Sequence, residues 1–514
     1  MRLSRLIRGI DPLEITGRTD SEVASVCYDS RQCREGSLFA AISGLKADGH
    51  EFITDALSRG AGFIIHEGEF HPPPGVTAIR VRDSRRCLGI LGKNFFADPS
   101  AGICLIAVVG TNGKTTVTYL IESILQTAGF TVGVLGTVNY RYGKKTFPAP
   151  NTTPESFEMQ KIIREMSDHG ITHIVAEVSS HALDLKRVDD CAFDLGIFTN
   201  LTQDHLDYHR TMDNYFQAKK RFFSEVLPAG GKNRPHNTIV NVDDPWGRLL
   251  LRELGPESAS GHLTYGIESP CDITASPFRL SLDGIEATLL LGGERLPVSS
   301  PLMGRFNLSN ILAAAAASLA LGIPGRGIRD GIAALLQVPG RLEKVSTAGQ
   351  PAVFVDYAHT DDALRRVLEN LSLFRTGRLI TVFGCGGDRD RGKRPLMGEA
   401  VSADSDLVIV TSDNPRTEDP LSIIREIETG IRMVKYAEAG DPARHPTGRG
   451  YLVIPDRKAA IAAAISLADA QDIVLIAGKG HEDYQIIGTK RFPFDDRVIA
   501  REELTHWQAG RKGR

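Results

Sequence analysis

The chain has 514 residues, of which 42% are hydrophobic and 24% are charged, and its formal net charge is −3. This composition is typical of a soluble globular protein, and the small net charge argues against a basic surface for nucleic acid. No run of about 18 apolar residues occurs in the sequence, so we expect no membrane-spanning helix. Seven dispersed cysteines without a CxxC pair, and an N-terminus without an apolar signal segment, indicate reduced thiols and a cytoplasmic location.

The length suggests about three domains at roughly 150 residues each. The first hundred residues are short segments of mixed character, whereas the rest alternates short β-branched runs with helix-like stretches, which predicts parallel, doubly wound α/β sheets. Loops near residues 97–100 and 338–340 divide the chain into predicted domains 1–100, 101–339 and 340–514. The predicted strands are Ile103–Val109, Ile174–Val178, Phe193–Thr199, Thr238–Val242, Ala352–Val355, Leu379–Phe383, Leu407–Val410 and Ile473–Ala477. The predicted helices include Thr115–Ala128, Leu308–Leu321, Asp361–Leu373 and Lys458–Ala470, and residues 269–301 are predicted to form a small antiparallel insertion.

A glycine-rich loop follows the strand predicted at Ile103–Val109 and precedes a helix. Its residues are Gly110, Thr111, Asn112, Gly113, Lys114, Thr115 and Thr116. Glycines let the backbone approach a phosphate, the helix N-terminus faces the anion, Lys114 adds a positive charge, and Thr115 offers a hydroxyl to Mg²⁺. The standard GxxxxGK[ST] pattern is incomplete because Val108 stands at its first glycine, so a plain glycine turn is the alternative.

Two further polar residues follow or end apolar strands. Glu177 ends the strand predicted at Ile174–Val178, and His205 follows the one predicted at Phe193–Thr199. Ligands bind outside the carboxyl ends of parallel strands, so this pair could hold a divalent cation beside the γ-phosphate. Taken alone, His205 is as well explained as a hydrogen-bonded loop histidine.

Eight motifs along the chain together resemble one family. In order they are GTNGKTT (110–116), NTTP (151–154), EVSSHAL (177–183), NLTQDHLDYH (200–209), DYAHT (356–360), GCGGDRDRGKRPLM (384–397), DNPRTEDP (413–420) and AGKGHEDYQ (477–485). They resemble the Mur ligases of bacterial cell-wall synthesis, and within that family the members that add the third residue of the peptide. The resemblance covers nearly the whole chain, and the DNPR and GKGHE motifs are its most specific parts.

The resemblance implies three domains, which bind in turn the UDP of a precursor, ATP, and, in a Rossmann-like domain, the incoming amino acid. It also implies the reaction. A carboxylate of UDP-N-acetylmuramoyl-L-alanyl-D-glutamate attacks the γ-phosphate of ATP to give an acyl phosphate, and the amine of the incoming amino acid then forms an amide. The expected ligands are small molecules only, with Mg²⁺ as cofactor, and we expect a monomer that binds neither nucleic acid nor a membrane.

The same resemblance implies roles for residues that would be unremarkable alone. Lys114, Glu177, His205 and Lys219 are the implied catalytic residues, and Thr115, Glu177, His205 and a carbamylated Lys219 the implied metal ligands. Without the family, Lys219 is one of several lysines on a basic helix. Asn307 and Asn310 are implied adenine contacts, with Arg341 and Asp356 near the ribose and phosphates. The precursor residues are Ser30, Leu45, Lys46, Ala47, Asn151, Thr152, Thr153, Ser179 and Arg187; Leu185 stands where some relatives carry Gln.

The loop Asp413-Asn414-Pro415-Arg416 indicates which amino acid is added. Meso-diaminopimelate differs from lysine by a distal carboxylate, which a guanidinium binds through two parallel hydrogen bonds. Arg416 is the expected donor, and the resemblance adds Arg389, Gly478 and Glu482. Without the family, the loop is an Asn-Pro turn with a solvated arginine. Two alternatives stay open: a lysine-adding or other Mur-type ligase, and a nucleotide-regulated binding protein with a decayed active site.

Overall fold

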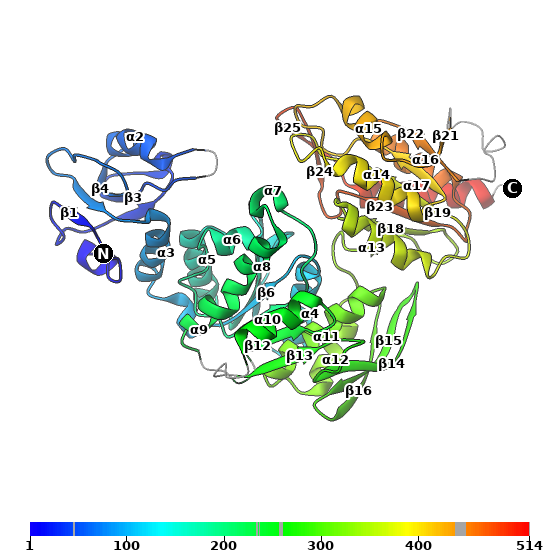
Figure 1. The fold of residues 1–514 in the computed structure, drawn as a ribbon, viewed down its shortest axis with the longest axis horizontal. Coiled ribbons are helices and arrows are strands. Elements are labelled where there is room, and N and C mark those ends of the chain that lie inside the picture. Colours follow the sequence, from blue (N-terminus) through cyan, green and yellow to red (C-terminus); the bar gives the residue numbers. More distant parts are fainter. Residues whose placement is uncertain (45–46, 233–234, 236, 256–260, 437–448, 513–514) are drawn as a thin grey trace. The chain divides into compact units, whose positions relative to one another are not determined.

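The computed structural model describes residues 1–44, 47–232, 235, 237–255, 261–436 and 449–512. The chain forms two compact units, one of residues 1–201, 211–273 and 313–328, and one of residues 202–210, 274–312 and 329–514 (Figure 1). No helix in the described ranges is long and apolar enough to cross a membrane. All seven cysteines have free thiols.

The N-terminal part of the first unit is a five-stranded sheet in the order β1-β5-β4-β3-β2. Its strands are parallel except for β1, which pairs antiparallel with β5. The strands are β1 Glu14–Thr16, β2 Ser25–Cys27, β3 Ser37–Ala40, β4 Ala61–His66 and β5 Thr77–Arg80, and the helices α1 Leu3–Leu6, α2 Ile53–Ser58 and α3 Ser84–Phe95. A short 3₁₀ helix, Ser30–Gln32, follows β2 and carries the buried Ser30.

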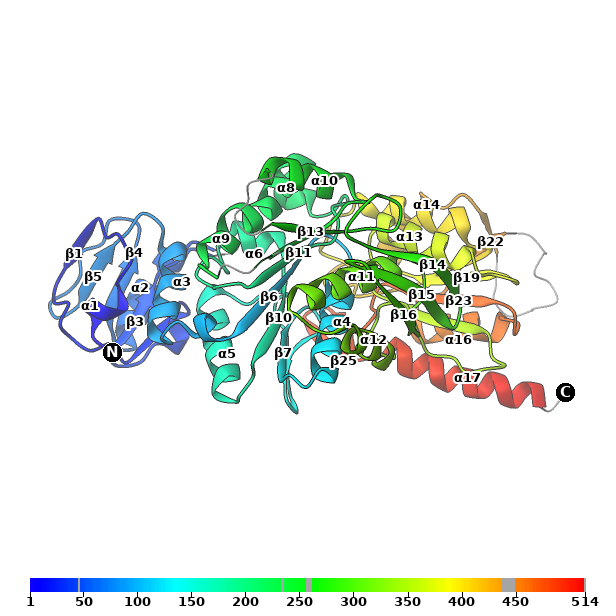
Figure 2. The same ribbon diagram turned by 90° about the horizontal axis from the view of Figure 1, so that it is seen from below.

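The larger part of the first unit is a parallel sheet of strands β13-β12-β11-β6-β10-β7, extended by antiparallel β8 and β9. Every residue of β6 is buried, as a β-branched strand covered on both faces should be. The strands are β6 Cys104–Val109, β7 Val132–Leu135, β8 Asn139–Tyr142, β9 Lys145–Pro148, β10 His173–Val178, β11 Leu195–Phe198, β12 Thr238–Asn241 and β13 His262–Tyr265. The helices are α4 Lys114–Thr127, α5 Ser156–Asp168, α6 Ser180–Asp184, α8 Met212–Arg221, α9 Leu227–Ala229 and α10 Pro245–Leu254, and α4 lies against β6, β7 and β10 (Figure 2).

The second unit is built on a seven-stranded sheet, β17-β18-β23-β19-β20-β22-β21, parallel except for β17. Alternate residues of its strands enter two cores. Phe354 and Leu475 pack with α13, α14 and α15, whereas Val353 and Val474 pack with α16 and α17. The strands are β17 Glu343–Lys344, β18 Ala352–Asp356, β19 Leu379–Phe383, β20 Leu407–Val410, β21 Val434–Lys435, β22 Gly450–Val453 and β23 Ile473–Ala477. The helices are α13 Asp361–Ser372, α14 Lys393–Asp404, α15 Pro420–Glu428, α16 Arg457–Leu467 and α17 Asp496–Lys512.

Smaller elements complete the described chain. β14 Ile273–Ser281, β15 Gly284–Leu291 and β16 Glu294–Ser300 are successive neighbours, with β15 and β16 antiparallel. Further elements are α7 Leu206–His209, α11 Arg305–Ala320, α12 Gly325–Ala334 and the antiparallel hairpin of β24 Tyr484–Ile487 and β25 Lys490–Pro493. Two more 3₁₀ helices, Gly49–Phe52 and Pro99–Gly102, and a π-helix, Phe222–Val226, are also present. The antiparallel pairing predicted within residues 269–301 is confirmed for β15 and β16, whereas β14 pairs parallel with β13 and extends the same sheet.

All eight predicted strands and all four predicted helices are present, with small shifts at their ends. The largest difference at a carboxyl end is in α16, which stops at Leu467 although the helical pattern runs to Ala470. The Asp472 carboxylate accepts the backbone N–H of Asp469 at 2.9 Å and pairs with Arg378 at 2.7 Å. These contacts of Asp472 hold the turn that follows Leu467 in a non-helical conformation, so α16 ends before Ala470. The predicted α/β class is confirmed.

Candidate active site

The glycine-rich loop joins β6 to α4 at the carboxyl edge of the central sheet. Its backbone is tied to the end of the neighbouring strand β11, because Thr111 N donates to Asn200 O at 2.9 Å and Asn112 N to Asn200 Oδ1 at 2.9 Å. Lys114 Nζ curls back onto the loop and donates to Gly110 O at 2.9 Å and Thr111 O at 2.8 Å. The loop therefore holds a preformed cationic turn at the N-terminus of α4, suited to a phosphate.

Glycine is required where this loop begins. Gly110 has a φ of 153°, and a Cβ there would lie 1.9 Å from Thr199 Oγ1. Thr199 Oγ1 in turn donates to Asn112 O at 2.7 Å. The two strand ends approach so closely that no side chain fits between them.

Glu177 lies in β10 beside the loop and is 2% exposed. Its carboxylate accepts from Thr115 Oγ1 at 3.2 Å, from Thr137 N at 3.0 Å and from Thr137 Oγ1 at 2.9 Å. The neighbouring Gly136 leaves room for it, since a Cβ there would lie 2.4 Å from Glu177 Oε1. The structure thus brings together Thr115 and Glu177, as predicted for a metal site.

Lys219 on α8 is 1% exposed, and its Nζ donates to Gly110 O at 2.7 Å and lies 4.5 Å above the Tyr215 ring. Lys219 and Lys114 therefore share the Gly110 carbonyl as acceptor. His205 has a positive φ of 55° immediately before α7 and lies 3.5 Å from Asp204 Oδ2. It belongs to the second unit, so its predicted place at the metal stays a prediction.

The predicted precursor residues of the central sheet cluster around Thr153. Thr153 Oγ1 donates to Glu177 O at 2.8 Å and accepts from Ser179 N at 3.1 Å, and Arg187 Nη1 donates to Thr153 O at 3.1 Å. Arg187 also pairs with Glu155 at 3.4 Å, a partner that the sequence did not indicate. The Arg187 guanidinium is thereby linked through Thr153 to the carboxyl end of β10.

The other predicted precursor residues are less enclosed. Asn151 is exposed, and Thr152 Oγ1 lies 3.1 Å from Thr137 Oγ1. Ala47 O accepts from Gly44 N at 2.9 Å, whereas Leu45 and Lys46 lie outside the described residues. Leu185, the position where some relatives have Gln, is the half-buried C-cap of α6.

The predicted nucleotide residues of the second unit form two pairs. Asn307 and Asn310 are buried on α11, where Asn310 Nδ2 donates to Asn307 Oδ1 at 3.0 Å. Asp356 ends β18 and accepts from Leu342 N at 2.5 Å and Ala358 N at 2.8 Å. Burial raises the pKa of Asp356, and the nearby charge of Arg341 partly lowers it.

The predicted amino-acid residues of the second unit converge at the carboxyl ends of β20 and β23. Asn414 Nδ2 donates to Glu482 Oε2 at 2.8 Å, and the fully buried Lys479 donates to the same carboxylate oxygen at 3.0 Å. Lys479 also lies 3.6 Å from Asp413 Oδ1. Gly478, with a φ of 115°, lies beside them, since a Cβ there would come 3.5 Å from Asp413 Oδ2. In this cluster the Lys479 ammonium group pairs with the carboxylates of both Glu482 and Asp413.

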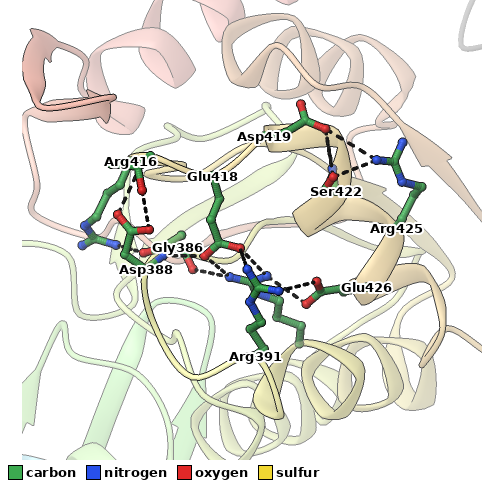
Figure 3. A network of polar contacts seen from close by, with 12 residues as sticks. Gly386, Asp388, Arg391, Arg416, Glu418, Asp419, Ser422, Arg425 and Glu426 are labelled. Carbon is green, nitrogen blue, oxygen red and sulfur yellow. Dashed lines mark hydrogen bonds and ion pairs between the residues drawn. The ribbon is translucent and has the colours of Figure 1, made fainter.

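Arg416 is held from three sides. Its Nη1 donates to Gly387 O at 2.6 Å, its backbone N to Ile486 O at 3.1 Å, and its carbonyl accepts from Gly488 N at 2.7 Å. Pro415 O lies against Gly387, where a Cβ would come within 1.9 Å of it. Arg389, on the same loop as Gly387, is exposed (Figure 3 shows the region).

Comparison with known proteins identifies the family. The Mur ligase family catalytic domain matches residues 22–96, the Mur ligase middle domain residues 108–318, and the Mur ligase glutamate ligase domain residues 340–480. A protein of Geobacter metallireducens named UDP-N-acetylmuramoyl-L-alanyl-D-glutamate–2,6-diaminopimelate ligase is 48% identical over 500 residues, 97% of either chain. The chain belongs to the Mur ligase family.

Solved structures agree with this assignment. A protein with the same ligase name is 32% identical, with 99% of both chains covered and a TM-score of 0.69. The MurF ligase of Thermotoga maritima in complex with ADP shares the fold at 19% identity, with 94% of this chain and 96% of its own covered and a TM-score of 0.59. This Mur ligase therefore has the expected three-domain α/β fold and is an ATP-dependent ligase, while the boundaries at residues 100 and 339 stay predictions.

The phosphate-loop residues of this Mur ligase fit a magnesium ion. Carboxylate and hydroxyl oxygens are hard ligands, and Glu177 and Thr115 present both within 3.2 Å of each other. Within the described ranges no group of three or more His, Cys, Asp and Glu residues has metal-binding geometry. Mg²⁺ commonly binds through one or two protein groups together with substrate phosphates, so this sparse donor set suits it.

Four residues of this Mur ligase site were not singled out from the sequence: Glu155, Arg394, Glu418 and Lys479. Each pairs with or supports a predicted site residue, as the contacts of Glu155 and Lys479 show. All four lie within or directly after the motifs that carried the resemblance. Their position in those motifs was the available signal, but partners such as Arg187 for Glu155 and Asn414 for Lys479 lie far away along the chain.

Proposed function

We propose that this Mur ligase adds meso-2,6-diaminopimelate to UDP-N-acetylmuramoyl-L-alanyl-D-glutamate, at the expense of ATP, in bacterial peptidoglycan synthesis. The observation that carries the proposal is the fixed Arg416 guanidinium beside the Asn414–Glu482–Lys479 cluster. A guanidinium and a carboxylate in one cluster match the distal carboxylate and ammonium of diaminopimelate. We further propose that the protein is a cytoplasmic monomer. Its ligands are small molecules, and it binds neither nucleic acid nor a membrane.

The first step joins two anions, since the D-glutamyl carboxylate of the precursor attacks the γ-phosphate of ATP. Phosphoryl transfer is accelerated mainly by positioning and charge neutralisation. Lys114 and the N–H groups at the start of α4 hold the phosphates, and Thr115 and Glu177 hold Mg²⁺, with His205 as a further ligand. The bound Mg²⁺ supplies positive charge that offsets the approach of the two anions. ADP leaves, and an acyl phosphate of the precursor remains.

The second step is attack of the diaminopimelate amine on that acyl phosphate, which forms the amide and releases phosphate. Arg187 and its neighbours Asn151, Thr152, Thr153 and Ser179 orient the precursor. In the second unit, Arg389 binds the carboxylate near the reacting amine, and Arg416 and Glu482 bind the distal carboxylate and ammonium. Asn307, Asn310, Arg341 and Asp356 bind the nucleotide.

Lys219 is proposed to act as a carbamate. The Lys219 ammonium would lose one proton, and the resulting amine would add to CO₂ with loss of a second proton, which converts a buried cation into an anion suited to a magnesium site. The carbamate keeps one N–H, so the hydrogen bond now made to Gly110 O at 2.7 Å can persist. Incubation with ¹³C-labelled bicarbonate should give a carbamate NMR signal that Lys219→Arg lacks; an identical signal in the variant would reject this modification.

The acceptor is tested by ADP release with ATP, Mg²⁺ and the UDP-dipeptide against separate amino acids. We expect release with meso-diaminopimelate and discrimination of about 10⁴ against L-lysine, because lysine leaves the Arg416 guanidinium without its anion. Equal turnover of L-lysine would favour a lysine-adding ligase. ATP binding without ADP release for any acceptor would favour a binding protein.

The role of Arg416 is tested by substitution. Arg416→Ala should lower kcat/KM for meso-diaminopimelate roughly a hundredfold or more, the loss expected for a bidentate charge-assisted contact. The matched control is Arg425→Ala, because Arg425 is an exposed arginine of the same region whose side chain contacts Ser422 Oγ at 2.8 Å and Asp419 at 3.5 Å. Unchanged use of diaminopimelate by Arg416→Ala would sink the assigned specificity.

A further inference from the structure

A network of charged side chains lies directly behind the Arg416 loop. At its centre is Glu418, two residues after Arg416. The Glu418 carboxylate accepts from Asp388 N at 2.6 Å and from Arg394 at 2.8 and 3.1 Å, and pairs with Arg391 at 3.0 Å. Figure 3 shows this carboxylate between the backbone at Asp388 and the arginine side chains near Glu426.

Arg394 makes this network costly to disturb. It lies in the first turn of α14 with a fully buried side chain, and its guanidinium is shared by Glu418 and, at 2.8 Å, Glu426. A buried guanidinium must be paired, because an uncompensated charge in the interior is strongly unfavourable. Hydrogen bonding from Arg394 holds the pKa of Glu418 down at about 2, so Glu418 is a carboxylate at neutral pH.

The network reaches Arg416 through the loop 386–388. Glu418 fixes the backbone of Asp388, and the Asp388 carboxylate accepts from Thr417 Oγ1 at 2.7 Å and Thr417 N at 3.2 Å. The adjacent Gly387 carbonyl is the acceptor of Arg416 Nη1. Displacement of Asp388 would therefore move the Gly387 carbonyl, which orients the Arg416 side chain.

We propose that Glu418, held by Arg394, is a positioning residue that sets the orientation of Arg416 and so the affinity for the distal carboxylate of the amino acid. The inference rests on the proposed function, since it concerns the same pocket. Glu418 itself does not contact the substrate. It acts by fixing the Gly387 carbonyl, which leaves the other guanidinium N–H groups of Arg416 directed for a bidentate contact.

The chain offers a matched control in Glu426. Glu426 and Glu418 each place a carboxylate oxygen 2.8 Å from Arg394. Of these two carboxylates, Glu418 is the one that also accepts a backbone N–H of the loop, that of Asp388. Glu426→Gln therefore removes a comparable ion pair and leaves the loop contact intact. Glu418→Asp keeps a charge for Arg394 but is too short to serve both Arg394 and Asp388 N, so it gives a second test if Glu418→Gln fails to fold.

The experiment measures KM for each of the three substrates, and thermal stability, in Glu418→Gln, Glu418→Asp and Glu426→Gln. We expect both Glu418 variants to raise KM for meso-diaminopimelate roughly tenfold to a hundredfold, the effect of a misplacement of about 1 Å. KM for ATP and for the UDP-dipeptide should stay within about twofold of wild type, because the residues proposed to bind these two substrates are not part of the Glu418 network. Glu426→Gln should lower stability and leave all three KM values unchanged.

The KM values of the three variants decide between a positioning role and a structural role. A selective rise in KM for diaminopimelate in the Glu418 variants alone supports the positioning role. An unchanged KM for diaminopimelate in those variants overturns it, as does an equal rise for all three substrates or an equal effect of Glu426→Gln, which would mean a merely structural role. Failure of the proposed function is separate: it appears in the wild-type protein, as ADP release that does not depend on diaminopimelate.

Discussion

Replacement of Gly110 by Ala tests the geometry of the phosphate loop most directly. The new Cβ would lie 1.9 Å from Thr199 Oγ1 and 3.2 Å from Asn200 N, so Thr199 must move and lose its bond to Asn112 O. Overpacking costs about 1–3 kcal/mol, the backbone at a φ of 153° about 1–3 kcal/mol for a non-glycine residue, and the lost hydrogen bond about 1 kcal/mol. We expect a total destabilisation of about 3–7 kcal/mol and loss of ADP release.

The measurement is chemical denaturation together with ADP release, with Gly129→Ala as control. Gly129 also has a positive φ, 92°, but a Cβ there meets nothing within 4 Å, so that variant reports backbone strain alone. Adding Thr199→Ala to Gly110→Ala should recover part of the stability, since it removes the closest contact and makes the two changes non-additive. If Gly110→Ala is no less stable than Gly129→Ala and still releases ADP, the steric reasoning is wrong.

Three further predictions concern charged groups. Glu177→Gln should retain the fold but reduce ADP release roughly a thousandfold, as expected for the loss of a carboxylate beside Mg²⁺ at about 4 kcal/mol. Glu418 has a folded pKa of about 2 against an ordinary 4.5, so its stabilisation is present above pH 4.5 and is lost as the pH falls toward 2; Glu418→Gln should lose less stability on that acidification than wild type, by denaturant titration. Asp496→Asn leaves the fully buried Arg457 without its 2.6 Å partner and should cost about 3–5 kcal/mol in the same assay.

The parts of the fold that follow from local pattern could be predicted from the sequence. Short β-branched runs such as Leu379–Phe383 are buried on both faces, and such runs have few alternatives to a parallel strand. The turn at Gly110–Thr116 could also be predicted, because glycine, lysine and threonine at that spacing between a strand and a helix are typical of a phosphate-binding loop. The proximity of Thr115 and Glu177 was implied by the family resemblance, and the neighbouring positions of β6 and β10 in the sheet account for it.

The parts that depend on side-chain partners far along the chain could not be predicted. Lys479 and Asn414 are 65 positions apart yet both bind Glu482, and Glu155 pairs with Arg187, which also lies far away in the sequence. The charges of residues 388–394 resemble a solvated cluster when taken alone, and Arg389 is indeed exposed, whereas Arg394 is fully buried. The local sequence does not distinguish these two arginines, because the burial of Arg394 depends on the packing of α14 against α15 and on its pairs with Glu418 and Glu426.

Backbone strain in the second unit indicates why such a network is kept. Asp388 and Arg416 both have a φ of 52°, a conformation that costs non-glycine residues about 1–2 kcal/mol each. Strain of this kind persists only where the surroundings fix it from several sides. Ile486 and Gly488 fix Arg416, and Glu418 fixes Asp388, so both strained residues lie on the two loops that meet at the Gly387 carbonyl. Without these contacts the Arg416 guanidinium would be mobile, and under the proposed function a mobile guanidinium would lose much of its discrimination between an amino acid with a distal carboxylate and one without.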